Sequence, residues 1–182
     1  MIPNGYIRVT EPLKILKNYS HIDPDVLKNA ADRGTDVHHF CEMHMKNIYC
    51  DISEACEPYV KSFVDWYDNN VHELLFVEER VNSATLKLSG QLDIIATLKD
   101  SKDKIAIIDI KTPVSTCKTW KLQTAAYRLL AKEEMGIKID QRYCLKLSKN
   151  SSPAKLIQFE NHREDEKTYL NLLEIYRDFL IT

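Results

Sequence analysis

The amino-acid sequence predicts an α/β fold in which helices flank a mixed β-sheet. Up to about residue 70 the apolar residues recur at helical spacing. Beyond that point they gather in short runs rich in Val, Ile and Leu, which is typical of strands. A helical segment over 118–135 separates three of these runs from the next one. Three strands in a meander, followed by a helical crossover, give a mixed sheet.

Two helices are expected before the strands begin. The first spans 24–48, because Asp23 is a suitable N-cap and Pro24 fits the first helical position. Gly34 lies inside this helix at a cost of about 1 kcal/mol relative to alanine, which suggests that another backbone packs close to it. The second helix spans 54–68. The apolar side of the first helix consists of Leu27, Ala30, Ala31, Val37, Cys41, Met45 and Ile48, and that of the second of Tyr59, Phe63, Trp66 and Tyr67.

The remaining elements follow from the apolar pattern and from the residues that interrupt it. Pro113 has no amide hydrogen and ends the third strand, and Gly136 closes the crossover helix. We expect one domain over 1–182, with a helical N-terminal part over about 1–70. The order is strands over 74–81, 86–98 and 105–112, a helix over 118–135, strands over 143–147 and 156–159, and a helix over 164–180.

The composition limits the class of protein. The chain has 182 residues and a net charge of -2, which argues mildly against a nucleic-acid-binding protein but allows a local basic groove. No apolar run approaches the roughly 20 residues that span a bilayer, and the N-terminus lacks the pattern of a signal peptide. We therefore expect a cytoplasmic protein without a membrane partner. The 5 cysteines include no C-x-x-C pair, so a zinc ribbon is not supported.

Two aspartates are predicted to face each other across a hairpin. The polar stretch 99–104 is the expected turn, and residues opposed across it have numbers that add up to about 202, as 93 and 109 do. Asp93 and Asp109 would then have Cβ atoms roughly 5 Å apart. Opposed like charges on a half-buried sheet are unfavourable unless a cation binds between them.

A lysine joins the two aspartates on the same patch. Side chains alternate along a strand, so Asp109 and Lys111 share one face while Ile108 and Ile110 point into the core. Carboxylates can hold Mg²⁺, which polarises a phosphate and acidifies a water, and the lysine can stabilise developing charge. The alternative is a surface ion pair with no chemistry. Gly90 and the apolar flanks favour the catalytic interpretation.

Four motifs resemble those of a known family. "RGTDVHHF", "SGQLD", "IIDIKT" and "LQTAAY" occur in this order. Together they resemble the PD-(D/E)xK nuclease superfamily, and within it the RecB-type branch, which includes small phage-encoded exonucleases. The resemblance covers about residues 6–180. It implies a restriction-endonuclease-like core, in which the meander and crossover predicted above form the central sheet.

The resemblance also implies roles for individual residues. His38 would be a helix-borne metal ligand, Asp93 the aspartate that reaches the metal, and Asp109 a second acidic ligand. The backbone carbonyl of Ile110 would be a further ligand, and Lys111 would be the catalytic lysine. The implied cofactor is Mg²⁺ or Mn²⁺.

Further roles are implied on the first strand and on the crossover helix. Gln123 and Tyr127 would form the Q-x-x-x-Y motif of this branch, since residues four apart share a helix face; both could instead be ordinary helix residues. Glu79 resembles a glutamate often found on the first strand, and Glu42 lies one turn after the histidine. No iron–sulfur cluster is expected, because Cys144 is the last cysteine.

The predicted function is a metal-dependent deoxyribonuclease, most simply a sequence-independent exonuclease. The core and its flanking helices use nearly the whole chain and leave no subdomain for reading bases in the major groove. Lys118, Lys121 and Arg128 could track a phosphate backbone. A structure-specific flap endonuclease and a non-catalytic DNA-binding protein are the alternatives. The resemblance suggests a phage or bacterial setting of recombination or repair, with a strand-annealing or recombination protein as partner.

Overall fold

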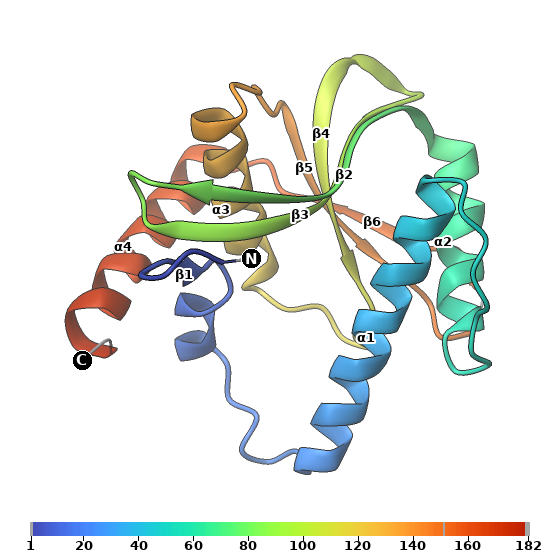
Figure 1. Cartoon of the computed structure of the whole chain (residues 1–182), viewed down its shortest axis with the longest axis horizontal. Helices are drawn as coiled ribbons and strands as arrows, with labels where there is room; N and C mark the ends of the chain where they lie inside the picture. Colours follow the sequence, from blue (N-terminus) through green and yellow to red (C-terminus); the bar gives the residue numbers. More distant parts are fainter. Residues whose placement is uncertain (1, 151, 181–182) are drawn as a thin grey trace.

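The computed structural model describes residues 2–150 and 152–180 and shows a mixed sheet with helices on both faces (Figure 1). Helices α1 and α2 cover one face of the sheet, and α3 and α4 cover the other. The elements are β1 (Ile7–Arg8), a short 3-10 helix η1 (Pro12–Leu16), α1 (Pro24–Met45), α2 (Glu57–Asn70), β2 (Val71–Ser83), β3 (Leu88–Leu98), β4 (Ser101–Lys111), α3 (Trp120–Glu134), β5 (Gln141–Lys146), β6 (Lys155–Gln158) and α4 (His162–Leu180).

The sheet is arranged around β3. Strand β2 runs antiparallel along one edge of β3, while β4, antiparallel, and β1, parallel, share the other edge. Helix α3 carries the chain from β4 to β5, which is parallel to β4, and β6 closes the sheet antiparallel to β5. The predicted meander and helical crossover are thereby confirmed. Strand β1 was not expected within the N-terminal part that we predicted to be helical.

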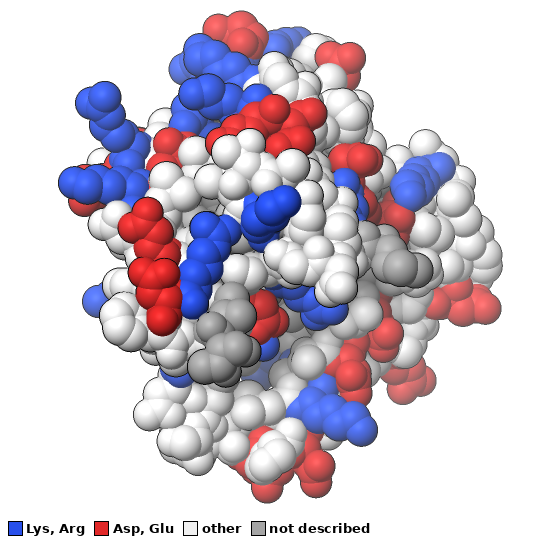
Figure 2. All heavy atoms as spheres, turned by 60° about the vertical axis from the view of Figure 1, so that its left-hand side comes forward, with Lys and Arg blue, Asp and Glu red and all other residues white. Residues whose placement is uncertain are grey.

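The surface mixes charges of both signs. On the face shown in Figure 2, basic and acidic side chains are interspersed, in keeping with the small net charge of -2. No helix in the described part of the chain is both long enough and apolar enough to cross a membrane.

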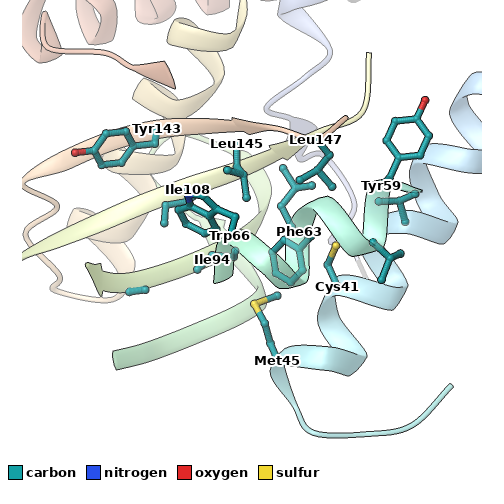
Figure 3. Packing of buried hydrophobic residues seen from close by; sticks show 14 of the residues in the cluster. Cys41, Met45, Tyr59, Phe63, Trp66, Ile94, Ile108, Tyr143, Leu145 and Leu147 are labelled. Carbon is teal, nitrogen blue, oxygen red and sulfur yellow. The ribbon is translucent and has the colours of Figure 1, made fainter. Parts of the chain in front are cut away.

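Two apolar clusters hold the layers together. In the first, shown in Figure 3, Phe63 and Trp66 of α2 and Met45 of α1 point towards Ile94 and neighbouring residues of the sheet. The second lies on the opposite face and joins the sheet to α3, α4 and η1. Burying one large apolar side chain contributes about 1.5–3 kcal/mol, so these clusters supply most of the attraction between layers.

Only the second half of α1 belongs to the core. Its N-cap is as predicted, with the Asp23 carboxylate accepting a hydrogen bond from the Asp25 amide at 2.8 Å. The buried positions are Val37, Cys41 and Met45, whereas Ala31 is exposed and Ile48 lies beyond the end of the helix. The predicted apolar side is therefore wrong for its first half, because that half extends past the sheet, where Ala31 and Gly34 line a cleft.

The register predicted for the β3–β4 hairpin is correct, although its turn is shorter than expected. Ile94 pairs with Ile108 and Thr97 with Ile105, so the numbers of opposed residues add up to 202 as predicted. Leu98, however, pairs with Ser101, and residues 102–104 already belong to β4. A register shift between Thr97 and Leu98 reconciles the tight turn with the pairing further along the strands.

Two glycines differ in how much room they leave for a side chain. A Cβ on Gly90 would lie 2.7 Å from Leu130 Cδ1 and 3.0 Å from Tyr127 Cε1, so the glycine lets α3 approach β3 closely. A Cβ on Gly34 would meet only the Thr112 hydroxyl, at 3.5 Å. The expectation that another backbone packs against Gly34 is therefore wrong.

We expect opposite stability changes when these two glycines are replaced by alanine. Gly90→Ala should lower the free energy of unfolding by about 1–3 kcal/mol, the usual cost of overpacking a core. Gly34→Ala should raise it by up to about 1 kcal/mol, because alanine is the better helix former and the site has room. Urea unfolding followed by circular dichroism measures both. A change of the same sign in the two variants would contradict the packing described here.

Candidate active site

The predicted catalytic residues come together in one cleft. The cleft has a volume of about 770 Å³ and lies between α1, the sheet and α3. All five side chains that the sequence singled out as catalytic line it, together with the predicted metal ligand His38. They are Asp93 of β3, Asp109 and Lys111 of β4, and Gln123 and Tyr127 of α3.

His38 lies at the centre of a group of oxygen atoms. Its Nδ1 atom is 3.6 Å from Glu78 Oε1 and 3.5 Å from Asp93 Oδ2, and its Nε2 atom is 3.1 Å from the Ile110 carbonyl oxygen. Asp93 Oδ2 also accepts a hydrogen bond of 2.7 Å from the Ile110 amide. Burial alone would lower the pKa of His38, but the Asp93 carboxylate outweighs it and raises this pKa to about 10. Without a metal the imidazole is thus a cation between two carboxylates.

The same atoms fit a divalent cation. Ligand atoms of His38, Glu78 and Asp93 all lie within 4.8 Å of one another. Glu78 Oε1 is buried and has no hydrogen-bond partner among the described residues, which is unusual for a buried polar atom. Two carboxylates, an imidazole and a nearby carbonyl oxygen form a donor set of the kind that holds Mg²⁺ or Mn²⁺.

A second group surrounds Asp109. Its Oδ2 atom lies 2.5 Å from the Lys111 ammonium, and its Oδ1 atom accepts a hydrogen bond of 2.9 Å from Gln123 Nε2. Gln123 Nε2 also lies 2.9 Å from the Tyr127 hydroxyl, while Gln123 Oε1 accepts a hydrogen bond of 3.1 Å from Lys111. The Cys144 thiol donates to Asp109 Oδ2 at 3.5 Å. Gln123 and Tyr127 are therefore linked by hydrogen bonds to the acid and the lysine.

The electrostatics of the second group reflect its burial. Burial raises the pKa of the Asp109 carboxyl, and the Lys111 ammonium offsets this only in part. Burial would lower the pKa of Lys111, but the Asp109 carboxylate reverses the shift and raises it. We expected Asp93 and Asp109 to repel each other unless a cation separated them. Each instead has a partner of its own, His38 for Asp93 and Lys111 for Asp109.

The glutamate on the first long strand is Glu78, whereas the sequence pointed to Glu79. Glu78 lines the cleft, while Glu79 is exposed. Glu78 has a φ of 51°, in the left-handed region, and this breaks the alternation of side chains along β2. The break is matched on β3, where Leu92 and Ile94 pack in opposite apolar clusters although they are two residues apart. The resemblance placed the glutamate one residue too far along the strand, and no sequence signal marks the left-handed φ of Glu78.

Gln91 is a further site residue that the sequence reasoning missed. Its Nε2 atom donates a hydrogen bond of 2.6 Å to Glu78 Oε2, and its Oε1 atom accepts one from Arg80. This chain of contacts orients the Glu78 carboxylate. Gln91 stands in the quoted motif "GQLD", and that position was the one available signal. Glu42, which was considered for the site, lines the cleft but pairs with Lys46 at 2.6 Å.

Two of the three predicted DNA-contacting side chains are held elsewhere. Arg128 pairs with Glu166 of α4 and donates to the Ile139 carbonyl, and Lys121 lies 3.3 Å from Asp165 of α4. These pairs connect α3 to α4, since both side chains lie on the side of α3 that meets α4, and a contact of either residue with DNA stays a prediction. Lys118 is exposed in the loop before α3, and its contact with DNA remains a prediction.

A buried arginine, Arg142, connects β5 to the same part of α4. Arg142 of β5 is fully buried and lies 2.6 Å from Asp165, and it also donates to His162 Nδ1 and to the Lys121 carbonyl. Removing one partner of such a pair typically costs 3–5 kcal/mol, so this cluster fixes α4 against the sheet.

The comparisons with known proteins agree with this geometry. A family model described as the PD-(D/E)XK nuclease superfamily matches residues 14–178. This match supports a hydrolase that acts on nucleic acid. The chain belongs to the PD-(D/E)XK nuclease superfamily.

Two solved structures resemble the chain. One is a "Putative exonuclease" from Eubacterium rectale, with a TM-score of 0.58 over 96% of this chain and 79% of that chain, at 9% sequence identity. At this identity the likeness concerns the fold, and it confirms the restriction-endonuclease-like sheet. The other is the protein SSO0001, with a TM-score of 0.48 and 15% identity over 100% of this chain and 80% of that chain. No curated protein matches this chain significantly.

Proposed function

We propose that the protein is a Mg²⁺- or Mn²⁺-dependent deoxyribonuclease. The observation that carries this proposal is the buried Glu78 oxygen that accepts no hydrogen bond from the described residues, beside His38 and Asp93 and in the same cleft as the Asp109–Lys111 pair. The cleft thus offers two positive charges, a bound cation and the protonated lysine. Both can stabilise the negative charge that develops when a phosphodiester is attacked. The family match adds independent support for nucleic-acid hydrolysis.

In this proposal His38, Glu78, Asp93 and the Ile110 carbonyl hold the cation. The predicted ligand role of Asp109 stays a prediction, because its carboxylate is paired with Lys111. A divalent cation bound there would polarise the scissile phosphate and lower the pKa of a water. His38 has to release the proton that it carries between the two carboxylates, because an imidazolium cannot ligate. Gln91 keeps Glu78 turned towards the site through the hydrogen bond described above.

The lysine and its partners act on the reacting groups. Lys111 has three N–H donors, of which Asp109 and Gln123 engage two. The third is free to reach the attacking water or a phosphate oxygen. Gln123 uses both ends of its amide, on Lys111 and on Asp109, and so holds the lysine at a fixed position. The Asp109 carboxylate keeps Lys111 protonated by raising the pKa of the ammonium.

We further propose that cleavage proceeds from DNA ends without sequence preference. The walls of the cleft are elements of the core itself, namely α1, β2, β3, β4 and α3, so none of them is spare for insertion into the major groove. Tyr127 is buried at the wall of the cleft, and its hydrogen bond with Gln123 suits it to position that amide. The name of the Eubacterium rectale protein agrees with an exonuclease. A role in recombination or repair beside a strand-annealing protein is part of this proposal.

The test compares three DNA substrates of equal length: a linear duplex, a covalently closed circle and a flapped duplex. With Mg²⁺ or Mn²⁺ we expect degradation of the linear molecule and survival of the circle, and with EDTA no cleavage. Protein with Lys111→Ala, prepared in parallel, controls for contaminating nucleases. Cleavage at the flap junction would favour a structure-specific endonuclease, and nicking of the circle at a comparable rate would exclude the exonuclease mode. Binding without any cleavage would identify a non-catalytic DNA-binding protein.

A further inference from the structure

A row of lysines continues the active-site strand across the sheet. Lys111 of β4 is the register partner of Lys146 on β5, and Lys146 is the register partner of Lys155 on β6. Register partners on neighbouring strands leave the sheet on the same face, and like charges placed opposite each other are destabilising. Neighbouring strands lie about 4.8 Å apart, so the row extends about 10 Å from the catalytic lysine.

The outer lysines of this row surround a cavity that contains no acid. The cavity has a volume of about 270 Å³ and is lined by Lys146, Lys149 and Lys155, by the hydroxyl-bearing residues Tyr59, Thr112 and Ser148, and by apolar residues. Neither an aspartate nor a glutamate is among the lining residues. Within the described ranges, none of the three lysines lies at ion-pair distance from a carboxylate, whereas Lys111 is paired with Asp109.

The cavity adjoins the catalytic cleft. Thr112 lines the cavity and directly follows Lys111. The Thr112 hydroxyl is also 3.5 Å from the position that a Cβ on Gly34 would take, and Gly34 lines the catalytic cleft. A chain of phosphates that leaves the cleft at Lys111 can therefore pass Thr112 and reach the three lysines.

We propose that Lys146, Lys149 and Lys155 bind the backbone phosphates of the DNA strand next to the scissile phosphate. This proposal rests on the proposed nuclease function. The ligand is the phosphodiester backbone of one strand, over roughly three nucleotides if each advances by about 3.4 Å. Lysine contacts to phosphates carry no sequence information, so the site holds the strand in place whatever its bases. The cavity thus adds phosphate contacts to those that the sequence predicts for Lys118, Lys121 and Arg128.

The test measures binding of a fluorescein-labelled oligothymidylate of 20 nucleotides in EDTA, by anisotropy over a range of salt concentrations. The variant K146Q/K149Q/K155Q is compared with the matched control K102Q/K132Q/K167Q, which removes three exposed lysines at other places. Each lost phosphate contact lowers the slope of log affinity against log salt by about 0.7 for single strands, so three lower it by about 2. If wild type and K146Q/K149Q/K155Q bind the oligonucleotide equally at 1 M salt, the affinity of the variant should be about 100-fold lower than that of wild type at 0.1 M salt.

The outcomes separate this proposal from the nuclease assignment. A control triple variant that keeps the wild-type slope, together with the loss in the first variant, supports the proposal. Equal slopes in both triple variants, or wild-type protein that does not bind the oligonucleotide, overturn it. Displacement of the oligonucleotide by thymidine 5′-monophosphate at equimolar phosphate also overturns it, because that result indicates a mononucleotide site. Cleavage of the same oligonucleotide in Mg²⁺ is scored separately: its absence would defeat the nuclease proposal and leave the phosphate site standing.

Discussion

Glu78→Gln is expected to abolish cleavage and to weaken Mn²⁺ binding by at least 100-fold. Glu78 supplies a buried carboxylate oxygen without a partner beside His38 and Asp93, and its amide counterpart keeps the shape but loses the charge. Changes to residues that only support metal ligands already cost 10- to 100-fold in affinity, so a direct ligand should cost at least the upper value. Titration calorimetry with Mn²⁺ measures the affinity, and degradation of linear DNA measures the activity.

The neighbouring glutamate provides a matched control. Glu79→Gln removes the same charge from the same strand, one residue away, but its side chain is exposed and outside the cleft. It should bind Mn²⁺ and cleave DNA within about twofold of wild type, since surface substitutions away from special features have small effects. If Glu79→Gln lost metal binding and Glu78→Gln kept it, the site would be built around the other face of β2.

Lys111→Met is expected to lower the cleavage rate by roughly 100-fold or more and to destabilise the fold. The rate loss is the scale of a lost electrostatic or acid–base group. The stability loss has a separate cause: the substitution leaves the buried Asp109 carboxylate without its cation, which typically costs about 3–5 kcal/mol. Urea unfolding and single-turnover cleavage measure the two effects on the same protein.

A double variant separates the catalytic role of Lys111 from its structural one. Asp109→Asn/Lys111→Met replaces both charges, so no uncompensated charge remains in the core, and stability should return to within about 1 kcal/mol of wild type. Cleavage should stay lost. Recovery of cleavage in the double variant would show that Lys111 matters only for the fold. Mn²⁺ binding that disappears in Lys111→Met but persists in the double variant would point to Lys111 acting on the metal site through Asp109.

Much of this fold could be predicted because its signals are local. The change of period near residue 70 separates the helices from the strands, and the polar turn sets the register that brings Asp93 and Asp109 to neighbouring strands. Strand β1, by contrast, has two residues, too few for a periodic pattern. It exists because β3 offers a free edge at Leu88 and Ser89, which no local pattern in the N-terminal residues reveals.

The candidate site could be predicted where its motifs lie on regular helices and strands. It was missed where the backbone is irregular or where the interacting residue is distant in the sequence. Gln123 and Tyr127 share a helix face, and the structure brings both to the cleft. Glu78 was missed because Glu79 was chosen by resemblance alone, and the sequence gives no signal of the positive φ that accompanies the position of Glu78 in the cleft. The ion pairs of Lys121 and Arg128 were not predicted, because their partners lie on α4, about forty residues further along the chain, and helical periodicity carries no information about such pairs.

The break in side-chain alternation at Glu78 of β2 and Asp93 of β3 also limits how this protein can vary in length. Before the break Leu88 and Leu92 of β3 pack in the core beneath α3, whereas directly after it Ile94 packs in the core beneath α1 and α2. One residue inserted into β2 or β3, between this break and the Ser83–Leu88 connection, would shift the strand pairing by one position. The side chains of Leu92 and Val81 would then point to the opposite face of the sheet. The connection itself is a surface turn, where insertions are tolerated. Related sequences should therefore differ in length at residues 84–87 and keep a constant spacing from there to Asp93.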